Sequence, residues 1–376
     1  MRLSHHLIES LFFQFTDLGA AISAVQNHVS ENEIGLIRRL AEQNLPPVSS
    51  PEVLAALVGV NPGLVWSLLN RHERYYRTFT IQSGSKTRTI TAPRIALKII
   101  QKWLSFHLGK RVEVADHVYG FVPGRSHLAA AKRHIGAEWA YSVDLADFFA
   151  STPYELVFEA YESLGYEGYS AEVLARISCF RNFLAQGAPT SPVLSNICFR
   201  HKDVELVQIA SSLGCTVTRY ADDIVFSGTV AVPKELPELV SKMFESGPWH
   251  LAPHKELTQP LKGRIKIHGV LVKPNQLRLT KGYRNKIRAY SHVLATKGST
   301  ARDYRKLVGH VQYAEYVSRT TDSPSGVSSK SSDWREQQPH TLQPAPESLA
   351  GQVKPPEAAK ERGRFDLFKR WFGNPE

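Results

Sequence analysis

Apolar residues recur at helical spacing through the first 75 residues of the chain. Leu7, Leu11 and Phe12 fall on one face of a helix, and the same spacing of three and four residues returns at 34–40. The stretch 53–69 is interrupted by a Gly-Val-Asn-Pro run, which predicts two helices around a tight turn. Such a pair resembles a helix-turn-helix DNA reader, although the same arrangement is common without any DNA role.

Beyond residue 75 the pattern becomes mixed. Four segments have the short, β-branched and aromatic runs typical of strands: 78–81, 87–91, 139–150 and 215–227. Helical spacing marks an amphipathic helix at 96–108, mostly helical structure at 156–183 and another helix from about Ser191. Strands and helices therefore follow one another in an irregular order.

The composition changes near residue 320. Residues 320–360 are rich in Ser, Pro, Gln and Glu and hold few large apolar residues, so we expect 320–376 to be a disordered tail. Aromatic residues return at 364–372, which could form a short helix that docks a partner. A frayed terminal helix, or one packed on its own domain, explains the same pattern.

Positive charge is concentrated in one part of the chain. The net charge of the 376 residues is +11, and the stretch 255–306 holds 14 Lys and Arg against Glu256 and Asp303, a net of +12. A basic block within an otherwise balanced protein indicates a surface that binds a polyanion such as nucleic acid. The bland alternative is a solvated charged face.

Cysteine spacing and hydropathy bear on the compartment in which the protein is expected. The three cysteines show no CxxC pairing, so neither a zinc site nor a disulfide framework is expected. No signal peptide is recognisable near the start, and no apolar run approaches the ~18 residues of a membrane span. We therefore expect a cytoplasmic protein without membrane contact.

Three aspartates are the candidates for chemistry. Asp222 and Asp223 lie at a turn between the apolar runs 215–220 and 224–227, and Asp144 follows the strand predicted from Trp139. Adjacent carboxylates repel each other, and carboxylates gathered at strand ends suit hard divalent cations such as Mg²⁺. Two such ions clamp the attacking and leaving oxygens in phosphoryl transfer. The pattern predicts a two-metal nucleotidyl-transfer site, with the Leu145 carbonyl as a further ligand.

A loop and an ordered series of motifs accompany the acids. The run from Gln186 to Pro192 combines glycine, proline and small polar residues, which lets the backbone approach a nucleotide closely. With Asp144 to Phe149, Tyr220 to Asp223, the run from Lys86 to Ile90 with Ala92-Pro93, and Tyr119-Gly120-Phe121, the chain resembles the bacterial reverse transcriptases of the retron type. The resemblance covers about residues 50–318.

The resemblance implies a right-hand polymerase of the α+β class with a small antiparallel palm sheet. Its parts would be an N-terminal helical extension (1–75), interleaved fingers and palm (76–262) and a basic helical thumb (263–319), followed by the tail. The thumb would include a helix at 277–295 that lies along a duplex. The implied chemistry is RNA-templated DNA synthesis with two Mg²⁺ ions.

The resemblance also implies roles for individual residues. Asp144, Asp222 and Asp223 would be the catalytic carboxylates and, with Leu145, the metal ligands. Phe149 would exclude a ribose 2′-hydroxyl, Gln186 would line the nucleotide pocket, and Lys255 is a candidate general acid. Arg88 and Lys86 would contact the triphosphate. The implied nucleic-acid contacts are Arg125, His134, Lys281, Arg284, Lys286 and Arg288.

Three departures from the retron pattern stand out. The Pro-Lys of the fingers turn is replaced by Gln82-Ser83, where Lys86 could substitute. The NAxxH element appears as 130–134 without its Asn, and the VTG element at 267–269 keeps only its glycine. Because these elements are linked with recognition of the cognate RNA, template specificity could differ. His134 is equally well explained as a core histidine.

Retron resemblance further implies partners. The template would be a cognate structured noncoding RNA, the product a branched RNA-linked single-stranded DNA (msDNA), and the substrates dNTPs. A separate effector protein in antiphage defence and a host RNase H would complete the system. Alternatives are another bacterial reverse transcriptase class, of the abortive-infection or group II intron kind, and a noncatalytic nucleic-acid-binding scaffold that uses residues 53–69. The identities of the RNA and effector, the trigger of defence and the oligomeric state do not follow from the sequence.

Overall fold

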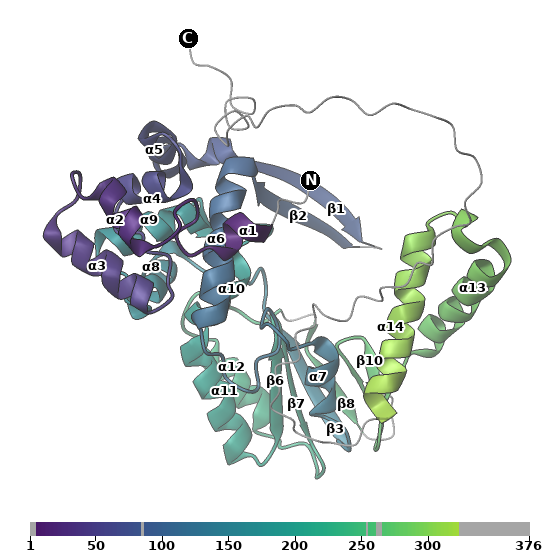
Figure 1. The fold of residues 1–376 in the computed structure, drawn as a ribbon. Coiled ribbons are helices and arrows are strands. Elements are labelled where there is room, and N and C mark those ends of the chain that lie inside the picture. Colours follow the sequence, from purple (N-terminus) through teal and green to yellow (C-terminus); the bar gives the residue numbers. More distant parts are fainter. Residues whose placement is uncertain (1–4, 84–85, 253–254, 261–264, 323–376) are drawn as a thin grey trace, which may run out of the picture. The chain divides into compact units, whose positions relative to one another are not determined.

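The computed structural model describes residues 5–83, 86–252, 255–260 and 265–322. All of them belong to one unit, Met1–Pro324. Helices are combined with small antiparallel sheets, as the mixed patterns predict (Figure 1). None of the helices in these ranges is long and apolar enough to cross a membrane.

The N-terminal segment is helical, as predicted. It contains α1 (His5–Glu9), α2 (Leu18–Val25), α3 (Glu31–Glu42), α4 (Pro51–Val58), α5 (Pro62–Asn70) and the short 3-10 helix η1 (His72–Tyr75). The predicted pair of helices around a tight turn is therefore confirmed as α4 and α5. This segment shares the large hydrophobic core of the rest of the unit. The indole of Trp103 donates to the Ser10 carbonyl at 3.0 Å and joins the following helix, α6 (Ile95–Arg111), to the N-terminal segment.

A hairpin and a long helix follow. Strands β1 (Tyr76–Ser83) and β2 (Lys86–Pro93) pair antiparallel over their full length, with Ser83 opposite Lys86. Helix α6 (Ile95–Arg111) comes directly after. The predicted strands at 78–81 and 87–91 and the helix at 96–108 are all present, each slightly longer than the periodicity indicates.

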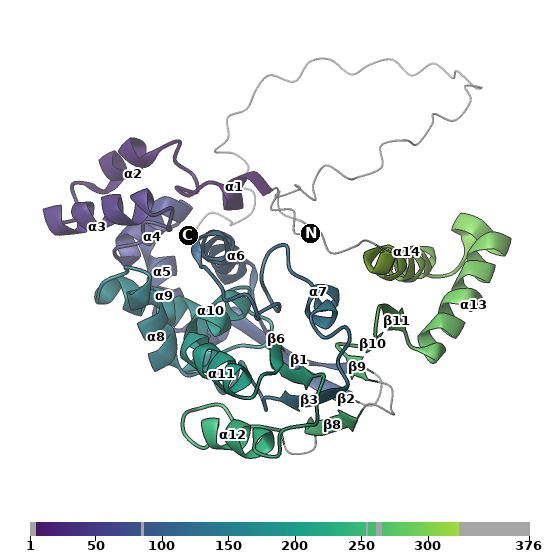
Figure 2. The same ribbon diagram turned by 90° about the horizontal axis from the view of Figure 1, so that it is seen from below.

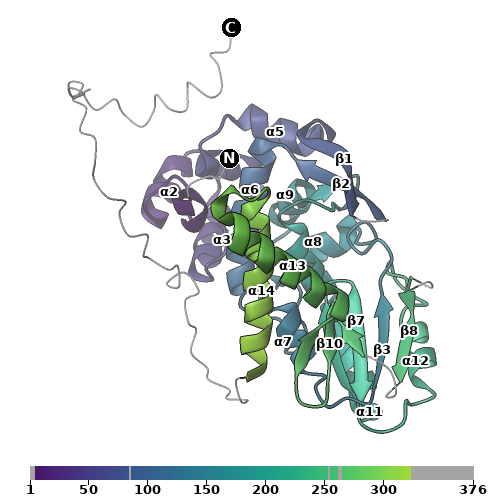
Figure 3. The same ribbon diagram turned by 90° about the vertical axis from the view of Figure 1, so that its right-hand side faces the viewer.

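The central sheet has the order β6-β7-β3-β8, with every neighbouring pair antiparallel (Figure 1). Figure 3 shows β7, β3 and β8 side by side. Its strands are β3 (Trp139–Asp144), β6 (Thr216–Tyr220), β7 (Asp223–Gly228) and β8 (Leu257–Pro260). The strand predicted at 139–150 ends early, at Asp144. Asp147 has a φ of +44°, and a left-handed residue cannot continue an extended strand.

Successive residues of this sheet face two different cores. Tyr141 and Phe226 point into the large core, whereas Ala140 and Val225 belong to a second cluster. That second cluster also holds Ile267, beyond the central sheet. The alternation is the two-residue period of a strand, and it explains why both faces of these strands are apolar.

Further helices lie along the chain between the sheets, and the mostly helical structure predicted for 156–183 is present except at its end. The elements are α7 (His127–Lys132), α8 (Tyr154–Ser163), α9 (Tyr169–Ser178), α10 (Ser191–Cys198), α11 (Arg200–Ser212) and α12 (Leu236–Met243). The helical structure predicted for 156–183 ends at Ser178, and β4 (Cys179–Phe180) pairs with β5 (Phe183–Leu184). Arg181 and Asn182 between them both have positive φ, +50° and +64°. Such a pair makes a tight hairpin turn and cannot belong to a right-handed helix.

The basic block forms a small sheet followed by two helices (Figure 2). Strands β9 (Lys266–Ile267), β10 (Val270–Val272) and β11 (Leu277–Leu279) lie in the order β11-β10-β9. Helices α13 (Lys281–Lys297) and α14 (Tyr304–Asp322) follow, with the 3-10 turn η3 (Gly298–Thr300) between them. The segment 263–319, expected as a basic helical thumb, therefore contains a small sheet in addition to its helices.

The helix predicted at 277–295 also begins later than expected. Leu277 and Leu279 are buried while Arg278 between them is exposed, which is strand alternation. Thr280 then caps α13 by accepting a hydrogen bond from the Tyr283 backbone. At the other end, α14 reaches Asp322, past the tail boundary predicted at residue 320. The predicted docking segment, 364–372, lies outside the described residues.

Candidate active site

The catalytic candidates Asp222 and Asp223 lie at a two-residue turn, Asp222 within it and Asp223 directly after it. Tyr220 ends β6 and pairs with Asp223, the first residue of β7, so Ala221 and Asp222 make the connection. Ala221 has a φ of +60° and is buried. A non-glycine residue in that region costs free energy, and such outliers concentrate at functional sites.

The third acid meets the doublet through the strand register. Asp144 is the last residue of β3 and lies directly opposite Asp223. One residue further, the Leu145 backbone donates to the Asp222 carbonyl at 3.0 Å. Residues nearly 80 positions apart in the sequence therefore meet at one end of the two central strands, as predicted.

The electrostatics of the three acids differ. Burial raises the pKa of Asp222 above its usual range, and the neighbouring charge of Asp223 adds to that effect while Arg88 opposes it. Asp144 forms an ion pair with the Lys255 ammonium. The Asp223 carboxylate accepts from Nδ1 of His268 at 2.9 Å. Each acid therefore feels a cationic or hydrogen-bonding group.

The donor set suits a hard cation, but its members are not arranged around one point. In the described ranges, no group of three or more His, Cys, Asp and Glu side chains is placed to hold a metal ion. Lys255 and His268 hold oxygens of Asp144 and Asp223. The fit lies in the donor chemistry, because clustered carboxylates with one raised pKa are stabilised by a divalent cation.

A cavity of about 880 Å³ opens beside the acids. It is lined by six of the residues singled out in the sequence: Arg88, Leu145, Phe149, Gln186, Asp222 and Lys255. The Gln186 carbonyl accepts from the Thr91 backbone at 2.8 Å, which fixes the loop against β2. The cavity brings the candidate nucleotide contacts Arg88, Phe149 and Gln186 from three separate stretches of the chain into one place.

Sequence reasoning named Phe121 only within a motif and did not single out Arg181, and both line this cavity. Phe121 contacts Phe149 with ring centroids 5.7 Å apart, and both rings line the cavity. Arg181 lines it from the β4–β5 turn and pairs with Glu73 through two hydrogen bonds. Arg181 was missed because Arg181 and Asn182 were taken as part of a helix, whereas both lie in the turn between β4 and β5.

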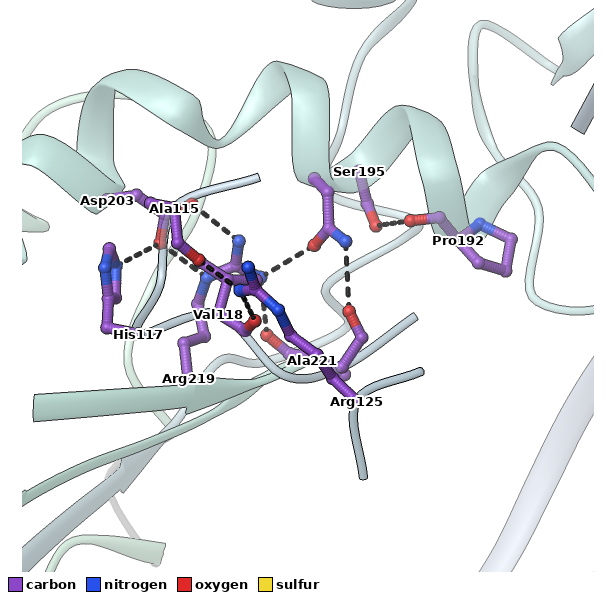
Figure 4. Close-up of polar contacts among 11 residues, drawn as sticks. Ala115, His117, Val118, Arg125, Pro192, Ser195, Asp203, Arg219 and Ala221 are labelled. Atoms are coloured by element: carbon purple, nitrogen blue, oxygen red, sulfur yellow. Dashed lines mark hydrogen bonds and ion pairs between the residues drawn. The ribbon is translucent and has the colours of Figure 1, made fainter. Parts of the chain in front are cut away.

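The catalytic turn is supported from below by a buried arginine. Arg219 of β6 is fully buried and binds Asp203 of α11 through two hydrogen bonds of 2.7 and 2.6 Å (Figure 4). Its Nη1 also donates to the Ala221 carbonyl and to Asn196 Oδ1, both at 3.1 Å. The strained residue of the turn is thus held by a charged side chain, a role that the sequence did not reveal.

Two predicted nucleic-acid contacts have other partners. His134 is only 1% exposed, and its ring nitrogens bond Ser227 at 2.6 Å and Thr218 at 2.7 Å. Burial lowers its pKa to about 3, so it is a neutral core histidine and its interpretation as a nucleic-acid contact is wrong. Arg125 donates to the carbonyls of Ala115 and Val118 (Figure 4), and to that of Val114 at 3.1 Å. That geometry favours a loop-anchoring role for Arg125.

The remaining predicted residues stay predictions. The side chains of Lys281, Arg284, Lys286 and Arg288 are exposed on α13, which has no buried residue. Their roles, like those of the three acids, are inferred from position and chemistry. The side chain of Lys86 lies outside the described part of the chain.

Comparison with known proteins bears on the whole site. The family described as "Reverse transcriptase (RNA-dependent DNA polymerase)" matches residues 82–282. The retron Ec86 reverse transcriptase of Escherichia coli is 32% identical over 192 residues, covering 50% of this chain and 60% of that protein. The retron Mx65 reverse transcriptase of Myxococcus xanthus is 29% identical over 304 residues, covering 74% of this chain and 71% of that protein.

The first of these alignments spans less than two thirds of the relative's length. Among solved structures, apo telomerase from Candida tropicalis aligns with a TM-score of 0.41 and 10% sequence identity. That alignment covers 59% of this chain and 61% of the telomerase chain.

Proposed function

Because the chain belongs to the reverse transcriptase family, we propose that it is an RNA-directed DNA polymerase of the retron type. One observation carries the proposal. Asp144 lies opposite Asp223 at the end of the two central strands, next to the cavity lined by Arg88, Phe149 and Gln186. A primer hydroxyl would attack the α-phosphate of a dNTP in that cavity, and pyrophosphate would leave.

The acids would hold two Mg²⁺ ions. Asp144 and Asp222 would be the shared ligands, with the Leu145 carbonyl as a further oxygen and Asp223 as a secondary ligand. When bound, the ions supply Lewis-acid stabilisation of the attacking and leaving oxygens. The raised pKa of Asp222 supports this, because a cation relieves the cost of ionising a buried carboxyl beside another one.

The cavity supplies the contacts to the nucleotide. Arg88 would bind the triphosphate, since its planar guanidinium matches phosphate oxygens in pairs. Lys255 would donate a proton to the departing pyrophosphate, a role supported by its ion pair with Asp144 and its position in the cavity lining. Phe149 would press against C2′ of the sugar, where an extra hydroxyl finds neither room nor a hydrogen-bond partner.

The basic segment would hold the template and product. The exposed cations of α13 suit contacts with phosphate and sugar, which fix the register of a duplex without reading its sequence. An RNA–DNA hybrid close to A-form is recognised in this way, through shape and backbone. Binding would weaken steeply as the salt concentration rises.

The biological setting is proposed from the retron relatives. The template would be a structured noncoding RNA, with priming from an internal guanosine 2′-hydroxyl and a branched msDNA as product. An effector protein would act with the enzyme in antiphage defence, and a host RNase H would trim the hybrid. The closest support is that the relatives above are named as retron reverse transcriptases.

The test is primer extension on an RNA template with the Asp222→Asn variant. We expect wild-type protein to incorporate dNTPs in the presence of Mg²⁺, and the variant to lose detectable extension while its affinity for RNA stays within about twofold. Extension by the variant at the wild-type rate would refute the proposed site. A protein that binds RNA but never extends a primer would support the scaffold alternative.

A further inference from the structure

His268 is a histidine in a turn that favours other residues. It connects β9 to β10 with Gly269, and Ile267 pairs with Val270 across the turn. The φ angles of His268 and Gly269 are +47° and +88°. Positive φ at both central residues is the signature of a type I′ hairpin turn, for which Asn-Gly is the preferred sequence. Turn formation alone therefore does not account for a histidine here.

The side chain of His268 is buried and directed at the catalytic doublet. It is 3% exposed, and its Nδ1 lies 2.9 Å from Oδ2 of Asp223. Because an ionised carboxylate only accepts hydrogen bonds, Nδ1 carries the proton and donates it. In the part of the chain described here, Nε2 has no hydrogen-bond partner. The contact with Asp223 is therefore what orients the imidazole ring.

The ring also packs on the tyrosine of the catalytic turn. Its centroid lies 5.4 Å from that of Tyr220, at an interplanar angle of 46°. On its other side, Tyr220 contacts His127 of α7 at 6.3 Å. His268 thus contacts both strands that flank the two-residue turn, at Tyr220 and at Asp223.

The small β9–β11 sheet that carries His268 is fixed to the central sheet. Ile267 and Val270, the residues on either side of the turn, are buried in the second hydrophobic cluster together with Val225 of β7. Val225 is two residues from Asp223 on the same strand. Packing of the residues on either side of the turn therefore holds His268 in place relative to Asp223, as the positioning of a metal ligand requires.

We propose that His268 is a positioning residue that fixes the orientation of the Asp223 carboxylate, the secondary metal ligand of the proposed function, through the Nδ1 hydrogen bond. The inference rests on the proposed function, because it concerns a carboxylate of that same site. Groups that orient a metal ligand typically contribute a factor of about 10 to 100 in metal affinity or activity.

Two substitutions separate the hydrogen bond from the turn. His268→Asn creates the favoured Asn-Gly turn and keeps an N–H donor on the atom that corresponds to Nδ1. His268→Gly also tolerates the positive φ, but it removes the donor. Both variants should fold, and their thermal midpoints should lie within a few degrees of the wild type.

The first readout is binding of Mn²⁺ alone, followed by electron paramagnetic resonance without nucleotide or primer. We expect the dissociation constant of the His268→Gly variant to rise about tenfold or more, and that of His268→Asn to stay within about threefold of wild type. In primer extension, kcat should fall in the Gly variant, KM for dNTP should change little, and Asn should restore kcat.

The outcomes are distinct. Equal Mn²⁺ affinity in the Gly variant and the wild type, or tighter binding in the Gly variant, would overturn the proposal. So would failure of Asn to restore what Gly removes. If wild-type protein bound Mn²⁺ with the expected dependence on His268 but never extended a primer, the positioning role would stand and the proposed polymerase function would fall.

Discussion

Arg219 and Asp203 form a fully buried ion pair directly beneath the catalytic turn, with two hydrogen bonds of 2.7 and 2.6 Å. The pair also orders its surroundings. His117 bonds the same carboxylate at 3.2 Å, and the guanidinium reaches the carbonyl of Ala221. Burial raises the pKa of Asp203, but the charge of Arg219 and hydrogen bonds from His117 and Arg219 outweigh it, so the carboxyl stays ionised.

Removing one partner of this pair should be costly. We expect Arg219→Met to lower the free energy of unfolding by about 3–5 kcal/mol, because Asp203 is left as an unpaired buried charge. The measurement is equilibrium unfolding in urea. The matched control is Arg39→Met, which breaks an exposed pair with Glu167 and should cost less than about 1 kcal/mol. Similar losses of unfolding free energy in the two variants would contradict the conclusion that the Arg219–Asp203 pair is buried and stabilising.

A second prediction concerns Gly120, which lies against the turn formed by Ala221 and Asp222. A Cβ built on Gly120 would stand 2.2 Å from the Ala221 backbone nitrogen, and the Gly120 carbonyl accepts from Asn196 at 3.0 Å. Backbone cannot yield as a flexible side chain can. We expect Gly120→Ala to displace the turn and reduce primer extension at least about tenfold, since misplacement by about 1 Å can cost 100-fold in rate.

The control for that variant is Gly109→Ala within α6. Nothing lies within 4 Å of a Cβ at Gly109. Alanine should therefore stabilise the helix by about 0.5–1 kcal/mol and leave the extension rate unchanged. If Gly120→Ala retained the rate of Gly109→Ala, the close approach to Ala221 would have no bearing on catalysis.

The alignment of Asp144 opposite Asp223 could be predicted because its determinants are local. Apolar runs before Asp144 and around the doublet specify strands, and polar residues at their ends specify the edge. Antiparallel pairing then brings Asp144 opposite Asp223. The helix–strand boundaries were less predictable, since the β4–β5 hairpin depends on two residues with positive φ that resemble helix residues in composition.

The supports of the turn could not be predicted. Arg219 lies in a strand among apolar residues, and its partners Asp203 and Asn196 come from two different helices. No spacing rule links them, because tertiary packing alone selects the pair. The same holds for His268, whose contact with Asp223 joins elements 45 residues apart. His134 shows the converse: the residue type permitted two roles, and only burial decided between them.

Phe149 offers a test of nucleotide selection. Its ring lines the cavity and contacts Phe121 and Phe148, each at 5.7 Å, so it is held in place from two sides. We expect Phe149→Ala to lower the preference for dNTP over rNTP by about 10- to 200-fold, the range that steric exclusion in an apolar pocket supplies. The measurement is kcat/KM for matched dNTP and rNTP substrates.

The control is Phe183→Ala, which removes an exposed aromatic ring from another wall of the same cavity. That variant should leave the ratio of dNTP to rNTP use within about threefold of wild type. A loss of discrimination of equal size at Phe183 would show that cavity volume, rather than the ring of Phe149, selects the sugar.

His134 makes the stability of the fold depend on pH. Burial lowers its pKa from 6.5 to about 3, with smaller contributions from the charges of His268 and Arg133. Below pH 6.5 the unfolded chain therefore binds a proton that the folded chain refuses, and stability falls as the pH falls. At 1.36 kcal/mol per pH unit, the loss amounts to about 2 kcal/mol at pH 5.

His134→Gln tests this directly, because glutamine keeps polar atoms near Ser227 and Thr218 but does not titrate. Unfolding free energies measured in urea between pH 7.5 and pH 4.5 should converge for the two proteins as the pH falls. Other buried histidines, such as His107 with its lowered pKa, contribute equally to both curves. Parallel curves over that range would mean that His134 takes up its proton in the folded state.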